Sequence, residues 1–174
     1  MNMDKTEKDT LGVVGTVRIE EIDAATGEVV DLYDERNTIT AEGFDAILRQ
    51  VINKDGMADQ NHSIKTIYLG NDTGAGSANN PESPSILSTY LDQTVVYEVP
   101  EDEIIVTYPT IGEFSLSALL DGEAIVDAAG VEAINYTSAT IRLNNDEAFS
   151  YKRFPIKTIS RLINIRITWN IKFS

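Results

Sequence analysis

Cysteine is absent from this chain of 174 residues, and histidine occurs once, at His62. Without cysteine there is no disulfide framework, no thiol nucleophile and no cysteine-ligated metal. No run of eighteen apolar residues occurs, and the first ten residues hold no apolar segment behind their charges. We therefore expect neither a signal peptide nor a membrane-spanning helix.

Basic residues are missing from the middle of the chain, and acidic residues are missing from its end. No Lys or Arg lies between Lys65 and Arg142, and all 28 Asp and Glu lie at or before Glu147. Residues 1–147 therefore carry a net charge of −20, whereas residues 148–174 carry +6. Either the basic strands pair with acidic neighbours inside one subunit, or opposite patches bring subunits together. The negative overall field disfavours a nucleic-acid partner.

The most regular pattern of the sequence lies at its end. Every second residue from Ile163 to Phe173 is large and apolar, which predicts a β-strand with one buried face. At roughly 3.3 Å per residue this strand is about 36 Å long, which is more than usual.

Several shorter segments are rich in β-forming residues and are separated by turn formers. Hairpins are predicted where 15–22 and 28–33 flank a turn at 23–27, and where 136–143 and 148–154 flank a turn at 144–146. Further strands are predicted over 64–69, 94–99, 103–108 and 114–120. Asp121-Gly122 matches a two-residue hairpin turn, and Pro155 is expected to interrupt pairing before the last strand.

One helix is predicted, over about 41–54. Thr40 suits the N-cap, and the apolar residues that follow have helical spacing: Phe44, Ile47, Leu48, Val51 and Ile52. Together these elements predict an all-β protein with one flanking α-helix, built as an antiparallel β-sandwich or a Greek-key barrel. We expect residues 1–10 to form an N-terminal arm and residues 11–174 a single domain, with a long loop over 70–85.

Catalytic and metal-binding patterns are weak. His62 lies in a polar segment, and two residues such as Asp59 and His62 do not make a metal site. The acidic run 101–103 is interpreted as solvated turn charges, and the glycine-rich 70–76 lacks the Lys-Ser/Thr of a phosphate loop. We predict no catalytic residues, no metal and no cofactor. The seven tyrosines are a candidate sugar-binding platform, although core or interface positions are favoured for them.

Four segments resemble small structural virion proteins of tailed bacteriophages. They are N-T-I-T-A-E-G-F-D-A-I-L at 37–48, I-Y-L-G-N-D at 67–72, Y-K-R-F-P-I-K at 151–157 and I-R-I-T-W-N-I-K-F at 165–173. Such segments recur in collar or tail adaptors, baseplate, head-fibre and decoration components. The resemblance covers most of residues 16–173 and implies a virion protein assembled in the host cytoplasm.

We therefore expect a non-enzymatic structural component that forms a homo-oligomer and attaches to portal, neck, tail, capsid or fibre proteins, with no nucleic-acid or membrane partner. The alternatives are a carbohydrate-binding module that recognises a host surface glycan and, least favoured, a hydrolase that works through His62. Candidate interface residues lie in the arm, the long loop and the basic end of the chain: Met1, Asp4, Lys5, Asn71, Asp72, Asn80, Lys152, Arg153, Arg166 and Lys172.

Overall fold

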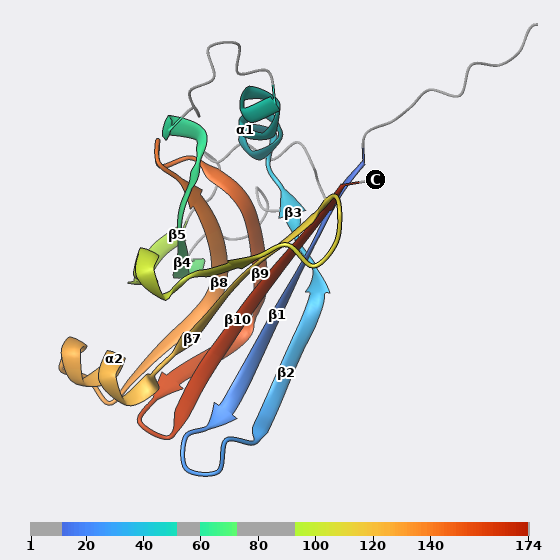
Figure 1. Ribbon diagram of the computed structural model, residues 1–174. Helices are drawn as coiled ribbons and strands as arrows, with labels where there is room; N and C mark the ends of the chain where they lie inside the picture. The colour runs from blue at the N-terminus through green and yellow to red at the C-terminus, as the bar shows by residue number, and fades with distance from the viewer. Residues whose placement is uncertain (1–11, 52–59, 73–92, 174) are drawn as a thin grey trace, which may run out of the picture.

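The structure, a computed structural model, describes residues 12–51, 60–72 and 93–173 (Figure 1). Its strands are β1 (Val13–Asp23), β2 (Val29–Arg36), β3 (Thr38–Ile39), β4 (Ile64–Asp72), β5 (Gln93–Glu98), β6 (Ile105–Thr107), β7 (Glu113–Leu120), β8 (Ala133–Leu143), β9 (Ala148–Ser160) and β10 (Ile163–Phe173). The helices are α1 (Ala41–Val51) and α2 (Gly122–Ala129), with short 3₁₀ turns η1 (Gln60–His62) and η3 (Glu101–Glu103). The expected N-terminal arm lies outside the described residues.

The strands form one antiparallel sheet that folds into two layers. The first layer has the order β2-β1-β10-β7-β6, and the second has the order β3-β9-β8-β4-β5. Among the described residues, a single pair, Ile163 with Ser160 at the β9–β10 turn, joins the two layers in the ladder. The predicted all-β class with a flanking helix is confirmed. The barrel alternative is wrong because the described strands do not close the sheet.

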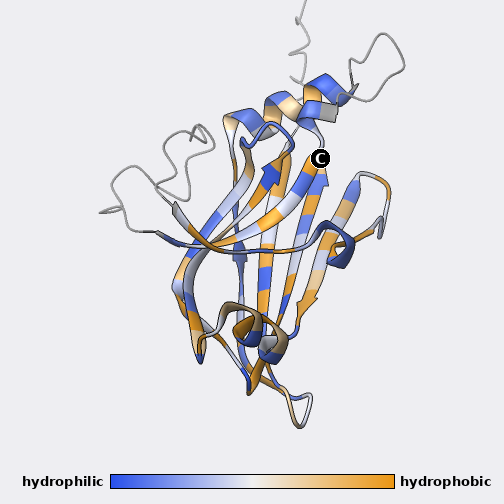
Figure 2. Ribbon diagram, turned by 90° about the vertical axis from the view of Figure 1, so that its left-hand side faces the viewer, coloured by the Kyte–Doolittle hydropathy of each residue, from blue (hydrophilic) through white to orange (hydrophobic). Residues whose placement is uncertain are grey.

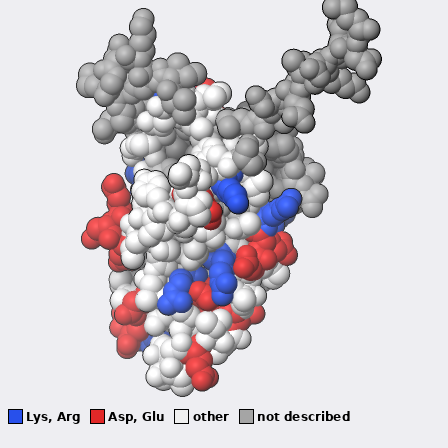
Figure 3. Space-filling model, turned by 45° about the vertical axis from the view of Figure 1, so that its right-hand side comes forward, with Lys and Arg blue, Asp and Glu red and all other residues white. Residues whose placement is uncertain are grey.

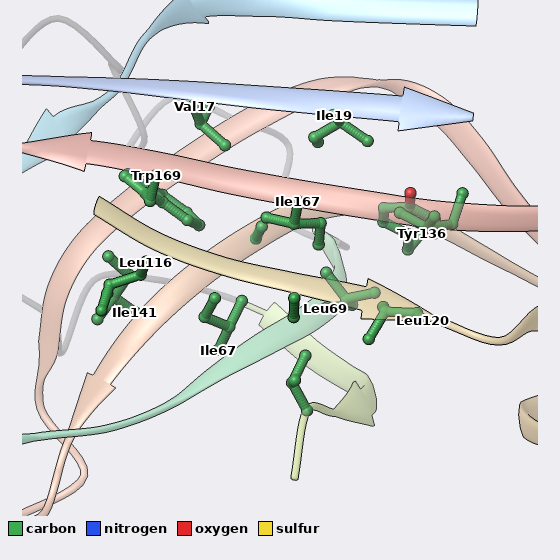
Figure 4. Packing of buried hydrophobic residues seen from close by; sticks show 14 of the residues in the cluster. Val17, Ile19, Ile67, Leu69, Leu116, Leu120, Tyr136, Ile141, Ile167 and Trp169 are labelled. Carbon is green, nitrogen blue, oxygen red and sulfur yellow. The ribbon is translucent and has the colours of Figure 1, made fainter. Parts of the chain in front are cut away.

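The core lies between the two layers. Val17, Trp169 and Leu116 are cross-strand partners on β1, β10 and β7, and all three face inward and are buried. Buried Ile67 on β4 and Ile141 on β8 face them from the second layer (Figure 4). Apolar and polar residues alternate along the strands, as Figure 2 shows, because successive side chains point to opposite faces. The expected alternation of β10 is thereby confirmed.

Helix α1 begins where the sequence predicts. The Thr40 hydroxyl accepts a hydrogen bond from the backbone N–H of Gly43 at 2.9 Å, which satisfies an otherwise unpaired N–H of the first turn. Gly43 lies against the backbone of β9, where a Cβ would overlap the carbonyl oxygen of Phe149. The helix thus packs on β9, and its expected continuation over 52–54 lies outside the described residues.

The predicted hairpin turn at Asp121-Gly122 is wrong, because α2 begins there. The Asp121 carboxylate accepts a hydrogen bond from the Ala124 backbone N–H at 3.1 Å, as an N-cap does. The Gly122 N–H donates to the Asn164 side-chain oxygen at 2.9 Å, and a Cβ on Gly122 would overlap the carbonyl oxygens of Ser160 and Ile163. The close approach to the β9–β10 turn therefore selects glycine, and the described residues contain two α-helices.

Strands β9 and β4 extend well past the ends predicted for them. Strand β9 continues through Pro155 to Ser160. Pro155 lies at the irregularity where the β8–β9 register shifts, opposite the β8 segment between Tyr136 and Ser138. A proline cannot donate to the ladder, so a local irregularity accommodates it without ending the strand. Strand β4 runs to Asp72 because Gly70–Asp72 pair with β5, so the predicted loop cannot begin at residue 70. The rest of that loop lies outside the described residues.

Replacing a buried isoleucine should destabilise the sandwich far more than replacing an exposed one. Ile167 is fully buried on β10, and Ile156 on β9 is 68% exposed. We expect Ile167→Ala to lower the free energy of unfolding by about 2–5 kcal/mol, because it removes buried methyl groups and leaves a cavity. Ile156→Ala should change it by no more than about 0.5 kcal/mol. Urea denaturation measures both, and equal losses would contradict the two-layer core.

Candidate functional site

The basic residues near the C-terminus are mostly paired inside the chain. Lys152 lies 3.0 Å from a Glu35 oxygen, Lys157 pairs with Asp31, and Arg166 lies 3.3 Å from a Glu20 oxygen. Arg161 pairs with Asp127 and lies 3.7 Å from Glu123. Figure 3 shows basic side chains lying directly beside acidic ones on this face of the molecule. The interpretation that the basic strands pair with acidic neighbours inside one subunit is confirmed for these four cations.

The candidate interface residues do not gather into one site. Arg166 and Lys172 lie on β10 in the first layer, whereas Asn71, Asp72, Lys152 and Arg153 lie on β4 and β9 in the second. Lys152 is buried, and Lys172 is exposed at the end of β10. Met1, Asp4, Lys5 and Asn80 lie outside the described residues.

One edge of the sandwich is closed by a seam between β2 and β9. Every second residue of β2 from Asp31 to Glu35 faces β9, where Lys157 and Lys152 hold the two carboxylates. Between them, the ring of Tyr33 lies 5.6 Å from that of Phe154, and its hydroxyl donates to Glu35 at 3.0 Å. We call these five residues together the β2–β9 seam: Asp31, Tyr33, Glu35, Lys152 and Lys157.

The seam shifts the ionisation of its members. The hydrogen bond from Lys157 lowers the pKa of Asp31, and hydrogen bonds from Lys152 and Tyr33 lower that of Glu35. Burial and the nearby Glu35 raise the pKa of Tyr33, so its hydroxyl stays protonated. Both carboxylates are about half exposed while both ammonium groups are nearly buried. The seam therefore compensates two lysine charges that have little access to water.

Removing one seam carboxylate should destabilise the protein in a pH-dependent way. Asp31→Asn leaves Lys157 buried without a counter-charge, so we expect a loss of about 1–2 kcal/mol at pH 7, below the cost for a fully buried pair. A carboxylate with a lowered folded-state pKa stabilises the fold above its unfolded value of about 4, and this contribution disappears as the pH falls through the folded pKa. The difference in free energy of unfolding between the variant and the wild type should thus become smaller below about pH 4.

The matched control is Asp34→Asn on the same strand. Asp34 pairs only loosely with the exposed Arg18, at 3.9 Å, so its loss should cost no more than about 0.5 kcal/mol. Urea denaturation at pH 7 and pH 3 measures both variants. Equal losses of stability in the two variants at pH 7 would contradict the assigned seam. So would a difference between Asp31→Asn and the wild type that is larger at pH 3 than at pH 7.

An apolar cavity of about 610 Å³ lies at the end of the sandwich that α1 covers. Ligand pockets commonly fall within roughly 300–1,000 Å³ and are mainly apolar. The walls come from both layers and α1, and Phe114 lies 6.5 Å from Phe149 and 6.3 Å from Phe173 between ring centroids. The lining residues include Ile47, Leu116, Ile104, Val106 and Tyr108, with His62, Lys65 and Glu101 as polar members.

Strand β6 forms one side of this cavity and is an open edge. It pairs with β7 on one side, and no strand in the described ranges pairs with the other. Ile105 is 61% exposed and Tyr108, just beyond the strand, is 79% exposed. Beyond them, Ile111 is fully exposed beside Gly112 and Phe173 in an adjoining hollow. An exposed apolar edge is a template for pairing with another chain.

The residues considered for chemistry from the sequence do not come together in a catalytic or metal-binding arrangement in the described part of the chain. His62 is half-buried in η1 at the cavity wall, and Glu101–Glu103 form the exposed turn η3. Tyr90 lies outside the described residues, and the other tyrosines range from buried Tyr136 and Tyr151 to exposed Tyr108. Within residues 12–51, 60–72 and 93–173, no three His, Asp or Glu are placed to hold a metal ion together. Val106 and Phe114 could not be recognised as cavity residues from the sequence, because alternation predicts a strand but does not show which strands lie at an edge.

Comparisons of the chain with protein-family models, with curated proteins and with solved structures each found no match. No helix in the described part combines the length and apolarity needed to cross a bilayer.

Proposed function

We propose that the chain is a non-enzymatic structural protein of a tailed-phage virion, present in several copies and attached to neighbouring virion proteins. The observation that supports this proposal is the open apolar edge at β6. Backbone N–H and C=O groups on such an edge can bond to a strand of another chain, and apolar side chains beside it add buried area. The resemblance of four segments to phage virion proteins agrees with this role.

Attachment through β6 is favoured over attachment through the basic C-terminal residues. Lys152, Lys157 and Arg166 already have carboxylate partners in the same chain, so a partner protein would have to replace those pairs. Exposed ion pairs also contribute only about 0–1 kcal/mol each. The edge at β6 is occupied by no strand of the described part and therefore costs no existing pairing.

A single charge on the β6 edge should reduce incorporation of the chain into particles. Ile105 faces away from the core, since its partner on β7 is outward-facing Ser117, so Ile105→Lys leaves the interior unchanged. Lysine on an edge strand opposes further pairing. We expect about tenfold less of this variant in particles, which corresponds to roughly 1.4 kcal/mol of attachment energy. Quantitative mass spectrometry of purified particles of the encoding phage measures it.

Ile156→Lys is the matched control, because Ile156 is similarly exposed but lies on β9 in the second layer and does not belong to the β6 edge. It should enter particles like the wild type, and circular dichroism should show both variants folded. Particles without any of the chain would overturn the virion proposal. Equal incorporation of the two variants would place attachment on another surface.

A second candidate function, glycan binding, is favoured by one observation. The exposed ring of Tyr108 stands at the mouth of the cavity, in the position of an aromatic platform. On a glycan array, this hypothesis predicts binding that Tyr108→Ala abolishes and Tyr108→Phe retains, because the ring face rather than the hydroxyl carries the contact. Absence of binding by the wild type would remove this candidate.

A further inference from the structure

The first layer ends one strand short of covering the cavity. Across this layer, Val17, Trp169, Leu116 and Val106 form one row of cross-strand partners on β1, β10, β7 and β6. The first three are at most 2% exposed, whereas Val106 is 48% exposed. Directly paired residues lie on the same face of a sheet. A residue paired with Val106 on an added strand would therefore also face inward.

The space into which that residue would point is the cavity of about 610 Å³. Val106 and Leu116 form its wall in the first layer, while Phe149 of β9 and Ile47 of α1 form the wall opposite. A cavity of this size accommodates at least one large apolar side chain. Because side chains on a strand alternate with a period of two, the ligand that fits is an extended segment with a large apolar residue at every second position.

The charges around the edge select the flanking residues of that segment. Glu101, Asp102 and Glu103 are exposed in η3 immediately before β6, and Glu113 begins the neighbouring β7. No Lys or Arg occurs between Lys65 and Arg142, and Lys65, at the cavity wall, lies 3.5 Å from Asp146. The same carboxylates would meet each other if β6 paired with β6 of a second copy, and facing like charges are unfavourable.

We propose that β6 accepts, as an added strand, an extended segment of a partner protein in which large apolar residues alternate with Lys or Arg. The apolar residue opposite Val106 enters the cavity, and the basic residues face η3 and Glu113. This inference rests on the proposed function, since it describes how the chain attaches to a neighbouring virion protein. Steering by opposite charge also makes the association sensitive to salt.

The test uses fluorescein-labelled synthetic peptides and the full chain. One nine-residue peptide alternates Lys with Val and has a central Phe, the second has Glu in place of every Lys, and the third has Ala in place of the Phe. We expect the Lys peptide to bind about tenfold more tightly than either of the others in fluorescence anisotropy, and to weaken between 50 mM and 500 mM salt. Changing the peptide rather than the cavity avoids any effect on folding.

Charge reversal on the protein gives the decisive comparison. The double variant Glu101→Lys and Glu103→Lys should bind the Glu peptide more tightly than the Lys peptide. The double variant Glu28→Lys and Glu132→Lys has the same net charge but changes exposed residues away from β6, so it should keep the wild-type preference. Absence of binding of the Lys peptide to the wild type up to about 1 mM would overturn the inference. An equal change of peptide preference in the two double variants would overturn it as well.

The two proposals fail separately. If particles contain the chain but the Lys peptide does not bind, only the proposal of an added strand at β6 is overturned. Peptide binding with the expected charge preference, but without the chain in particles, would overturn the virion role and leave the β6 site in place.

Discussion

The fold depends on apolar packing between two β-layers, because the strand ladder that joins them is very short. In the described part of the chain, the ladder passes from one layer to the other at the single pair Ile163 and Ser160. The layers are held instead by the inward rows of both, in which Trp169 and Ile167 of β10 are fully buried. Burial of apolar area contributes roughly 25 cal/mol per Å², so these rows dominate the stability of the sandwich. The helices and the cavity take their positions from this packing.

The two edges of the first layer have opposite properties for the same geometric reason. At β2, alternate polar residues meet Lys152 and Lys157 of β9, and the edge is closed by the β2–β9 seam. At β6, three residues of strand leave Val106 half exposed beside an apolar cavity. The charges follow this division, because Lys152 and Lys157 are neutralised at the closed edge while the acidic residues of η3 and Glu113 lie at the open one. A closed edge stabilises the subunit, and an open edge offers a strand to a partner.

Much of the sheet could be predicted from alternation and turn residues. The bounds of β10, the first hairpin and the N-cap of α1 at Thr40 agree with expectation, since each depends on neighbours in sequence. Asp121-Gly122 shows the limit of this reasoning, because the same dipeptide suits a hairpin turn and a capped helix. Contact of Gly122 with the β9–β10 turn, some forty residues later in the chain, selects the helix.

The candidate site was less predictable than the fold. The sequence alone determines which faces of the strands are buried, where helix α1 is capped and how charge is distributed along the chain. The reason is that periodicity and composition depend on neighbours in sequence. Tertiary structure alone decided that Lys152 and Arg166 neutralise carboxylates of their own chain and that β6 is an edge strand beside the apolar cavity. Which strands lie at an edge depends on pairings between residues far apart in sequence, and alternation within a strand carries no record of its neighbours.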